Sequence, residues 1–221
     1  MKKFILFLSM IVMLLCFVPL IFAADIHEAA KSGDSVTLKA LLDKDLSLLY
    51  LKDEVGKTPL HWAVGRGQIE IIKILLDTYK VNVNVRNDNE GTPLHVAASQ
   101  AQPEAAKILI AHGAEVSART KNGSTPLHFA AYKGKKPGHI ETAKILIENG
   151  ADINAKTDTG VTPLSMALLR QNNEIIAILR EHGAKGGSSR EDSRQQRMNR
   201  QKMMMQRQGV EQDEMELLGG E

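Results

Sequence analysis

Histidine and methionine are the side chains of this 221-residue sequence with the most chemical potential. His61, His95 and His128 follow one another at spacings of 34 and 33 residues, and imidazole is a common general base and metal ligand. Because they occupy one position of a repeated segment, we interpret them as making the same structural hydrogen bond in successive units. Units about 10 Å apart could not bring them to the roughly 2.0 Å bonds of one zinc ion. We therefore expect no enzyme activity, no cofactor and no metal ion at these residues.

The methionines suggest a different chemistry near the C-terminus. Met198 and Met203 to Met205 cluster there, and thioethers are soft ligands that suit Cu(I). The alternative function is therefore a copper or redox accessory protein, in which this segment holds the metal and the rest of the chain docks a client enzyme. Methionine-rich segments also serve as adaptable contact surfaces. Copper titration separates the two interpretations.

Composition excludes several classes of protein. The single cysteine, Cys16, lies in an apolar N-terminal run, so the chain after that run has no thiol for a disulfide, a cysteine zinc site or a cysteine nucleophile. The formal net charge of +2 comes from Lys2 and Lys3, because acidic and basic residues balance over the remaining sequence. Nucleic-acid binding needs several phosphates neutralised together. We therefore expect no nucleic-acid partner.

Residues 1–24 predict an export signal. Lys2 and Lys3 form a basic end, and residues 4–24 contain no charged residue, which is the pattern of a signal peptide. Ala23 and Ala24 are small residues that indicate cleavage there. The alternative is an uncleaved membrane anchor, since about 20 apolar residues span a bilayer. In both cases we expect the remaining chain outside the cytoplasm, periplasmic or secreted.

One seven-residue segment occurs four times, and a second segment with isoleucine and leucine at helical spacing follows each copy. The copies are separated by 34, 33 and 37 residues. The first segments are TPLHWAV at 58–64, TPLHVAA at 92–98, TPLHFAA at 125–131 and TPLSMAL at 162–168, and the second are EIIKILL at 70–76, EAAKILI at 104–110, ETAKILI at 141–147 and EIIAILR at 174–180. Residues 26–42 repeat this pattern without Thr-Pro.

The residue chemistry predicts two short helices in each unit. Proline in the first turn of a helix loses no needed hydrogen bond, and the threonine before it can cap exposed N–H groups. Glycine after the second segment, as at Gly113 and Gly150, tolerates the left-handed conformation that ends a helix. One unit cannot bury its own apolar side, so the units must stack.

These segments resemble the ankyrin-repeat family, whose 33-residue period carries the pattern T-P-L-H-x-A. The resemblance covers roughly three quarters of the chain. It implies an all-α fold, an α-solenoid of about five ankyrin repeats, each a helix-turn-helix plus a β-hairpin finger. The expected domains are a signal peptide or anchor at 1–24, repeats at about 25–57, 58–91, 92–124, 125–161 and 162–184, and a flexible polar tail at 185–221.

At two places the repeats contain extra residues, and we expect irregular structure there. Four extra residues lie near Lys135 to Gly138, and we place them in the loop between two helices. One extra residue lies near Tyr79 and Lys80, where the usual Gly-Ala helix end is missing. The position after the motif histidine or serine holds Trp62, Val96, Phe129 and Met166, and we therefore expect Trp62 to be a core residue between repeats and not a platform for a ligand.

The resemblance implies that such a solenoid is non-catalytic and binds another protein through a concave groove and its fingers. We expect this protein to be a monomer. In the family, the positions after the paired alanines of the first helix face the groove, and four of the five repeats place a cation there. Tyrosine and arginine dominate binding hot spots, so we expect an acidic or extended partner. The alternative is that these cations are only solvated surface charges. The candidate contact residues are Lys31, Arg66, Gln100, Tyr132, Lys133, Leu169 and Arg170. The finger tips carry charges of both signs, and we expect them to form a second row of contacts. They lie at 52–57, 86–90, 119–122 and 156–159.

Overall fold

The computed structural model describes residues 26–134 and 136–186, so the predictions for the two terminal segments lie outside the described residues. Within these ranges the elements are helices joined by turns, with no strand, and no helix combines the length and apolar character that a membrane span requires. Each repeat has an inner helix followed by an outer one. The pairs are 26–32 with α2 (Ser35–Leu42), α3 (Pro59–Arg66) with α4 (Ile69–Lys73) and η2 (Ile74–Thr78), α5 (Pro93–Gln100) with α6 (Pro103–Ala111), α7 (Pro126–Lys133) with α8 (Pro137–Glu148), and α9 (Pro163–Leu169) with α10 (Asn173–Glu181).

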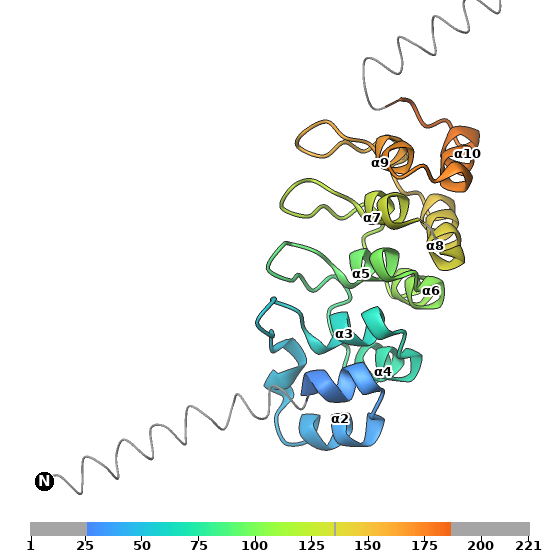
Figure 1. Ribbon diagram of the computed structural model, residues 1–221. Helices are drawn as coiled ribbons and strands as arrows, with labels where there is room; N and C mark the ends of the chain where they lie inside the picture. Colours follow the sequence, from blue (N-terminus) through green and yellow to red (C-terminus); the bar gives the residue numbers. More distant parts are fainter. Residues whose placement is uncertain (1–25, 135, 187–221) are drawn as a thin grey trace, which may run out of the picture.

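The helix pairs stack in sequence order into an elongated solenoid, which confirms the predicted fold class (Figure 1). The inner helices α3, α5, α7 and α9 contact one another in series, and the outer helices form a second row beside them. The core lies between the two rows, where the leucines of the Thr-Pro-Leu motif, such as Leu60, Leu94 and Leu127, are buried. The core of each repeat is therefore completed by side chains of the neighbouring repeats. A short 3₁₀ helix, η1 (Leu46–Tyr50), links the first repeat to the second.

The helix boundaries follow the predicted Thr-Pro and glycine signals. Helices α3, α5, α7 and α9 all begin at the proline, with the threonine as the N-cap residue. At the other end of the unit, Gly113 and Gly150 follow the outer helices with φ angles of 84° and 82°. Glycine adopts this left-handed conformation without steric cost, which explains its place in the sequence.

The extra residue near Tyr79 is accommodated by a change of helix type. Helix α4 continues into the π-helix η2, where the Tyr79 N–H donates to the Ile74 carbonyl oxygen, five residues back, at 3.2 Å. Lys80 then takes a φ of 53°. A π turn holds one residue more than an α turn, so Leu75 and Leu76 remain buried despite the insertion.

The four-residue insertion lies only partly in the predicted loop. Helix α8 spans 12 residues where α6 and α10 span nine, so Pro137 and Gly138 belong to its first turn. Proline is favoured at that position, which allows the earlier start. Gly138 brings the added turn against the preceding repeat, because a Cβ there would lie 2.5 Å from the Ala101 carbonyl oxygen.

This close approach makes a stability prediction. We expect Gly138→Ala to lower the free energy of unfolding by about 1–3 kcal/mol, the usual cost of overpacking, although alanine has the higher helix propensity. Lys144→Ala, on the exposed side of the same helix, is the control and should change it by less than about 0.5 kcal/mol. Urea unfolding compares the two variants. Equal stabilities would contradict the packing of Gly138.

The fingers form where the resemblance implied, but as turns and not as strands. One backbone N–H to carbonyl hydrogen bond closes each finger. The donor and acceptor residues are Asp53 and Lys57 at 3.0 Å, Asn87 and Gly91 at 2.9 Å, Thr120 and Ser124 at 3.0 Å, and Thr157 and Val161 at 2.9 Å. All fingers project from the side of the inner helices that is remote from the outer helices (Figure 1).

Candidate functional site

The repeated histidines bind the backbone of the next repeat. In each case Nε2 contacts the carbonyl oxygen of the residue just before the next motif threonine, while Nδ1 accepts a hydrogen bond from the backbone N–H of the threonine three residues earlier. The Nε2 contacts are His61 to Gly91 at 3.0 Å, His95 to Ser124 at 3.2 Å and His128 to Val161 at 3.0 Å. The predicted repeated structural hydrogen bond is confirmed.

Burial keeps these histidines neutral. Because Nε2 faces a carbonyl oxygen and Nδ1 faces a donor, the hydrogen-bond partners assign the proton to Nε2. Burial lowers the pKa of His61 and of His95 to about 4, against the opposing effect of the carbonyl contacts, and it also lowers the pKa of His128. Both ring nitrogens are thus committed to the backbone, and neither is placed to bind a metal or to accept a proton from a substrate.

Metal binding elsewhere receives no support from the described residues. In residues 26–134 and 136–186, no group of three histidine, aspartate or glutamate side chains is arranged to hold an ion. Met198 and Met203 to Met205 lie outside the described residues. The copper-binding alternative for that segment therefore stays a prediction from the sequence.

The seven predicted contact residues lie at or next to the C-terminal ends of the inner helices, and we call them the inner-helix row. They are Lys31 in the helix 26–32, Arg66 at the end of α3, Gln100 at the end of α5, Tyr132 and Lys133 at the end of α7, Leu169 at the end of α9, and Arg170 as its C-cap. Equivalent ends of stacked helices follow one another along the solenoid. The structure therefore brings these residues onto one side of the molecule.

Most of the positive charge in the row is not neutralised locally. Lys31 Nζ lies 3.7 Å from Glu28 Oε2. Arg66, Lys133 and Arg170 are exposed, and none of them forms an ion pair with another described residue. Exposed cations without a partner leave the row attractive to carboxylates.

Tyr132 and Arg170 contact each other within the row. The Arg170 guanidinium lies 4.5 Å from the centre of the Tyr132 ring, and its Nε donates to the Tyr132 carbonyl oxygen at 3.3 Å. Lys133 Nζ lies 5.8 Å from the same ring. The cation–π contact and the hydrogen bond together hold the guanidinium in place before any partner arrives.

Trp62 packs against the core, as expected, but it also reaches this surface. It is half-buried against the core, with Lys31 Nζ at 4.3 Å and Lys57 Nζ at 4.2 Å from its ring. Its Nε1 donates to Asp53 Oδ2 at 2.7 Å. The signal was present in the sequence, because Trp62 precedes Arg66 by four residues and so shares its helix face.

A hollow of about 170 Å³ lies beside Tyr132, and no pattern in the sequence predicted it. Phe129 and Met166 are half-buried and line it. Phe129 also packs edge-on against His95 of the preceding repeat, with ring centroids 5.6 Å apart. The complete lining is Asn122, Ser124, His128, Phe129, Tyr132 and Met166.

Two arginines in the predicted second row of contacts bind neighbouring fingers. Arg86 Nη1 donates to the Arg119 carbonyl oxygen at 3.0 Å, and Arg119 Nη1 donates to the Lys156 carbonyl oxygen at 3.0 Å. Arg119 also pairs with Asp158 at 3.3 Å. These two arginines join neighbouring fingers, so their guanidinium groups already have hydrogen-bond partners within the molecule.

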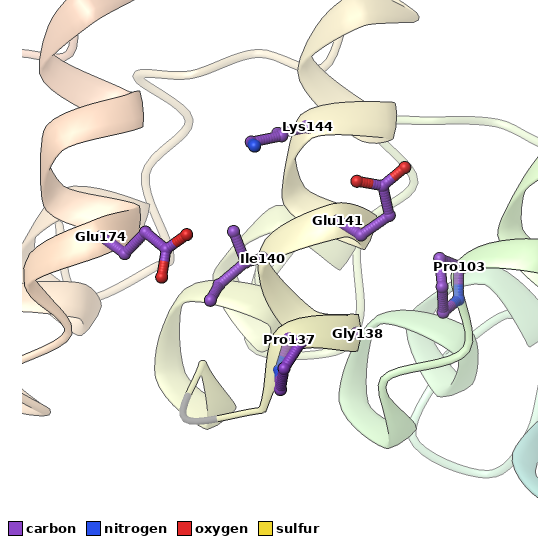
Figure 2. A pocket seen from close by; sticks show the side chains of 7 residues that line it. All are labelled: Pro103, Pro137, Gly138, Ile140, Glu141, Lys144 and Glu174. Carbon is purple, nitrogen blue, oxygen red and sulfur yellow. The ribbon is translucent and has the colours of Figure 1, made fainter.

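A second, larger hollow of about 470 Å³ opens on the outer helices (Figure 2). Glu141 on α8 and Glu174 on α10 lie on either side of Ile140 in this view. Lys107 pairs with Glu141 at 3.7 Å, and Lys144 adds a second cation to the site. This hollow therefore carries charges of both signs, unlike the inner-helix row.

Comparison with known families agrees with this architecture. The family model described as ankyrin repeats (3 copies) matches residues 26–120 and 116–190, which is most of the chain. A comparison with curated proteins finds no match. Ankyrin repeats are general modules for protein–protein interaction and are typically non-catalytic. The helix pairs, the finger turns and the family match together show that the chain belongs to the ankyrin-repeat family.

Proposed function

We propose that the chain is a non-catalytic, monomeric module that binds an acidic or extended partner protein through the inner-helix row and the adjoining fingers. The observation that carries this proposal is the set of exposed cations without an ion-pair partner in the described residues, Arg66, Lys133 and Arg170. They recur at equivalent helix ends, so an elongated partner could contact several of them at once. Complementary charge raises the association rate and fixes the register of such a partner.

The rigidity of the scaffold supports the same proposal. The histidine contacts join successive repeats through buried hydrogen bonds, and adjacent fingers are joined by backbone bonds such as Lys121 N–H to the Asn89 carbonyl oxygen at 3.0 Å. A surface that is ordered before binding loses little conformational entropy when the partner docks.

Charge reversal tests the proposed surface. Glutamate at all four cationic positions of the row should weaken capture of a partner at least tenfold, because attraction to carboxylates becomes repulsion. The row variant changes Lys31, Arg66, Lys133 and Arg170. The control makes the same charge change on the outer helices, at Lys73, Lys107, Lys144 and Arg180.

The full chain and both variants are compared in affinity capture from extract, quantified by mass spectrometry, followed by dissociation constants for the captured protein. Capture that survives reversal of the row, or that falls equally in the control, would refute this surface as the binding site.

We also propose that the protein acts outside the cytoplasm. Support comes from the basic end and uncharged apolar run of residues 1–24. Mass spectrometry of the mature protein should find an N-terminus near Asp25. A chain that begins at Met1 in a membrane fraction would instead indicate an uncleaved anchor.

A further inference from the structure

We propose that the hollow between the finger at 119–124 and helices α7 and α9 receives one apolar side chain of an extended partner segment, while Arg170 binds a carboxylate of the same segment. We call this hollow the side-chain pocket, with the six lining residues given above. The inference rests on the proposed function and adds the chemistry that the inner-helix row would recognise.

The volume of the pocket suits a single side chain. At about 170 Å³ it lies below the roughly 300–1,000 Å³ of sites that enclose drug-sized ligands. Its walls include the rings of Phe129 and Tyr132 and the thioether of Met166. Methionine adapts its shape to an apolar neighbour, so leucine, methionine or phenylalanine would fit this environment.

The base of the pocket carries no charge. His128 lines it, and both of its ring nitrogens are occupied by Thr125 and by the Val161 carbonyl oxygen. Burial lowers its pKa, so it stays neutral at physiological pH. A charged side chain would lose its hydration there without gaining a counter-ion, whereas an apolar one has little hydration to lose.

The edge of the pocket offers a polar contact to a peptide backbone. Asn122 is exposed, and its Oδ1 accepts hydrogen bonds from the Thr120 hydroxyl at 2.6 Å and from the Ser124 N–H at 3.3 Å. Its Nδ2 group has no hydrogen-bond partner among the described residues. It is thus available to donate to a carbonyl oxygen of the bound segment, which favours an extended peptide over a small apolar molecule.

Arg170 places a cation against a residue that lines the pocket. Its guanidinium lies against Tyr132, which is itself a wall of the pocket, and no described carboxylate pairs with it. An extended chain advances about 3.3 Å per residue, so a carboxylate one or two residues from the inserted side chain comes within reach. Arginine binds such a group through two parallel hydrogen bonds.

A random nine-residue peptide library displayed on phage and selected against the full chain tests the proposal. Selected peptides should share one leucine, methionine or phenylalanine with aspartate or glutamate within two positions. Serine in place of the apolar residue should weaken binding at least tenfold, measured by fluorescence anisotropy. Tyr132→Ala and Arg170→Glu should each have an effect of the same size, whereas Tyr50→Ala, at an exposed tyrosine on η1, should change binding less than twofold.

Met166 provides a direct readout of the pocket. It is the only methionine between residues 26 and 186, and its methyl NMR signal can be assigned with Met166→Leu. A selected peptide should shift this signal, and its serine version should not. Dispersion of the amide signals shows at the same time that each variant is folded.

Three results would overturn the pocket: selected peptides without the apolar and acidic pattern, binding that leaves the Met166 methyl signal in place, or equal effects of Tyr132→Ala and Tyr50→Ala. Peptides that depend on Arg170 but not on an apolar residue would refute the pocket and leave the proposed function intact. Binding that is insensitive to reversal of the whole row would refute the proposed function itself.

Discussion

Replacing His95 by alanine is expected to lower the free energy of unfolding by about 3–5 kcal/mol, the range found for removal of a buried ring. The substitution leaves the Ser124 carbonyl oxygen and the Thr92 N–H without their partner, and each unsatisfied buried group costs about 1–3 kcal/mol. It also removes the edge-on contact with Phe129. Because His95 joins two central repeats, the loss acts on the middle of the stack.

Chemical denaturation followed by far-UV circular dichroism measures this effect. His112→Ala is the matched control, since His112 is partly exposed at the C-terminal end of α6, where its Nε2 lies 2.8 Å from Asp77 Oδ1. Removing a surface pair of this kind should cost less than about 1 kcal/mol. A similar loss in both variants would contradict the structural role of the motif histidine.

Lowering the pH from 7 to 4.5 is expected to remove roughly 5 kcal/mol of stability through His61 and His95. Their pKa is about 4 in the folded protein and 6.5 for an unperturbed histidine, so between these values the unfolded chain binds more protons. Stability is therefore complete above pH 6.5 and falls as the pH drops towards 4. At about 1.4 kcal/mol per pH unit, each histidine contributes roughly 2–3 kcal/mol of this loss.

Other titrating groups also contribute to this profile. Burial also lowers the pKa of His128 and His139, which adds to the loss. The hydrogen bond from Asp77 raises the pKa of His112, so its contribution has the opposite sign, being present at low pH and lost above its folded pKa. That pair is largely exposed and correspondingly weak.

Urea unfolding at intervals between pH 7 and 4.5 tests the pH dependence. His95→Gln cannot take up a proton, so its pH dependence should be smaller by the roughly 2–3 kcal/mol that His95 contributes, whatever its stability at pH 7. His112→Ala should retain the full dependence. A flat profile in the parent protein would show that protonation of the buried histidines does not oppose folding.

Much of the fold was predictable because its signals are local. A helix start depends on threonine and proline in adjacent positions, and a helix end depends on one glycine, so both can be recognised within a few residues. The role of His61 was also predictable, since recurrence at one position excluded a single converging site. The family match then confirmed the resemblance to ankyrin repeats.

The irregular segments depended on packing and were predicted less well. The insertion before α8 could have formed a longer loop, but Gly138 allows the added helical turn to approach Ala101 of the previous repeat. Likewise, the residue added near Tyr79 is accommodated by a π-helix, in which Leu75 and Leu76 stay buried. Neither contact has a local sequence signal.

For the candidate site, the positions of the cations could be predicted from the repeat. Whether each cation has a partner within the molecule could not. Lys31 pairs with Glu28 one helical turn away, but Arg119 is bound by Lys156 and Asp158 of the following finger. Arg170 has no such carboxylate partner in the described residues and instead lies on Tyr132. The contacts of Arg119 and Arg170 join residues more than 30 positions apart, so no local pattern predicts them.

The printed sequence was sufficient to establish the repeat, its helices and the row of cations, because each of these depends on residue types at short and regular spacing. The side-chain pocket required the folded chain. Its walls come from a finger at Asn122, from α7 at Phe129 and from α9 at Met166, and the distances between their surfaces depend on how neighbouring repeats stack. No pattern within one repeat encodes that geometry, since the pocket exists only where two repeats meet.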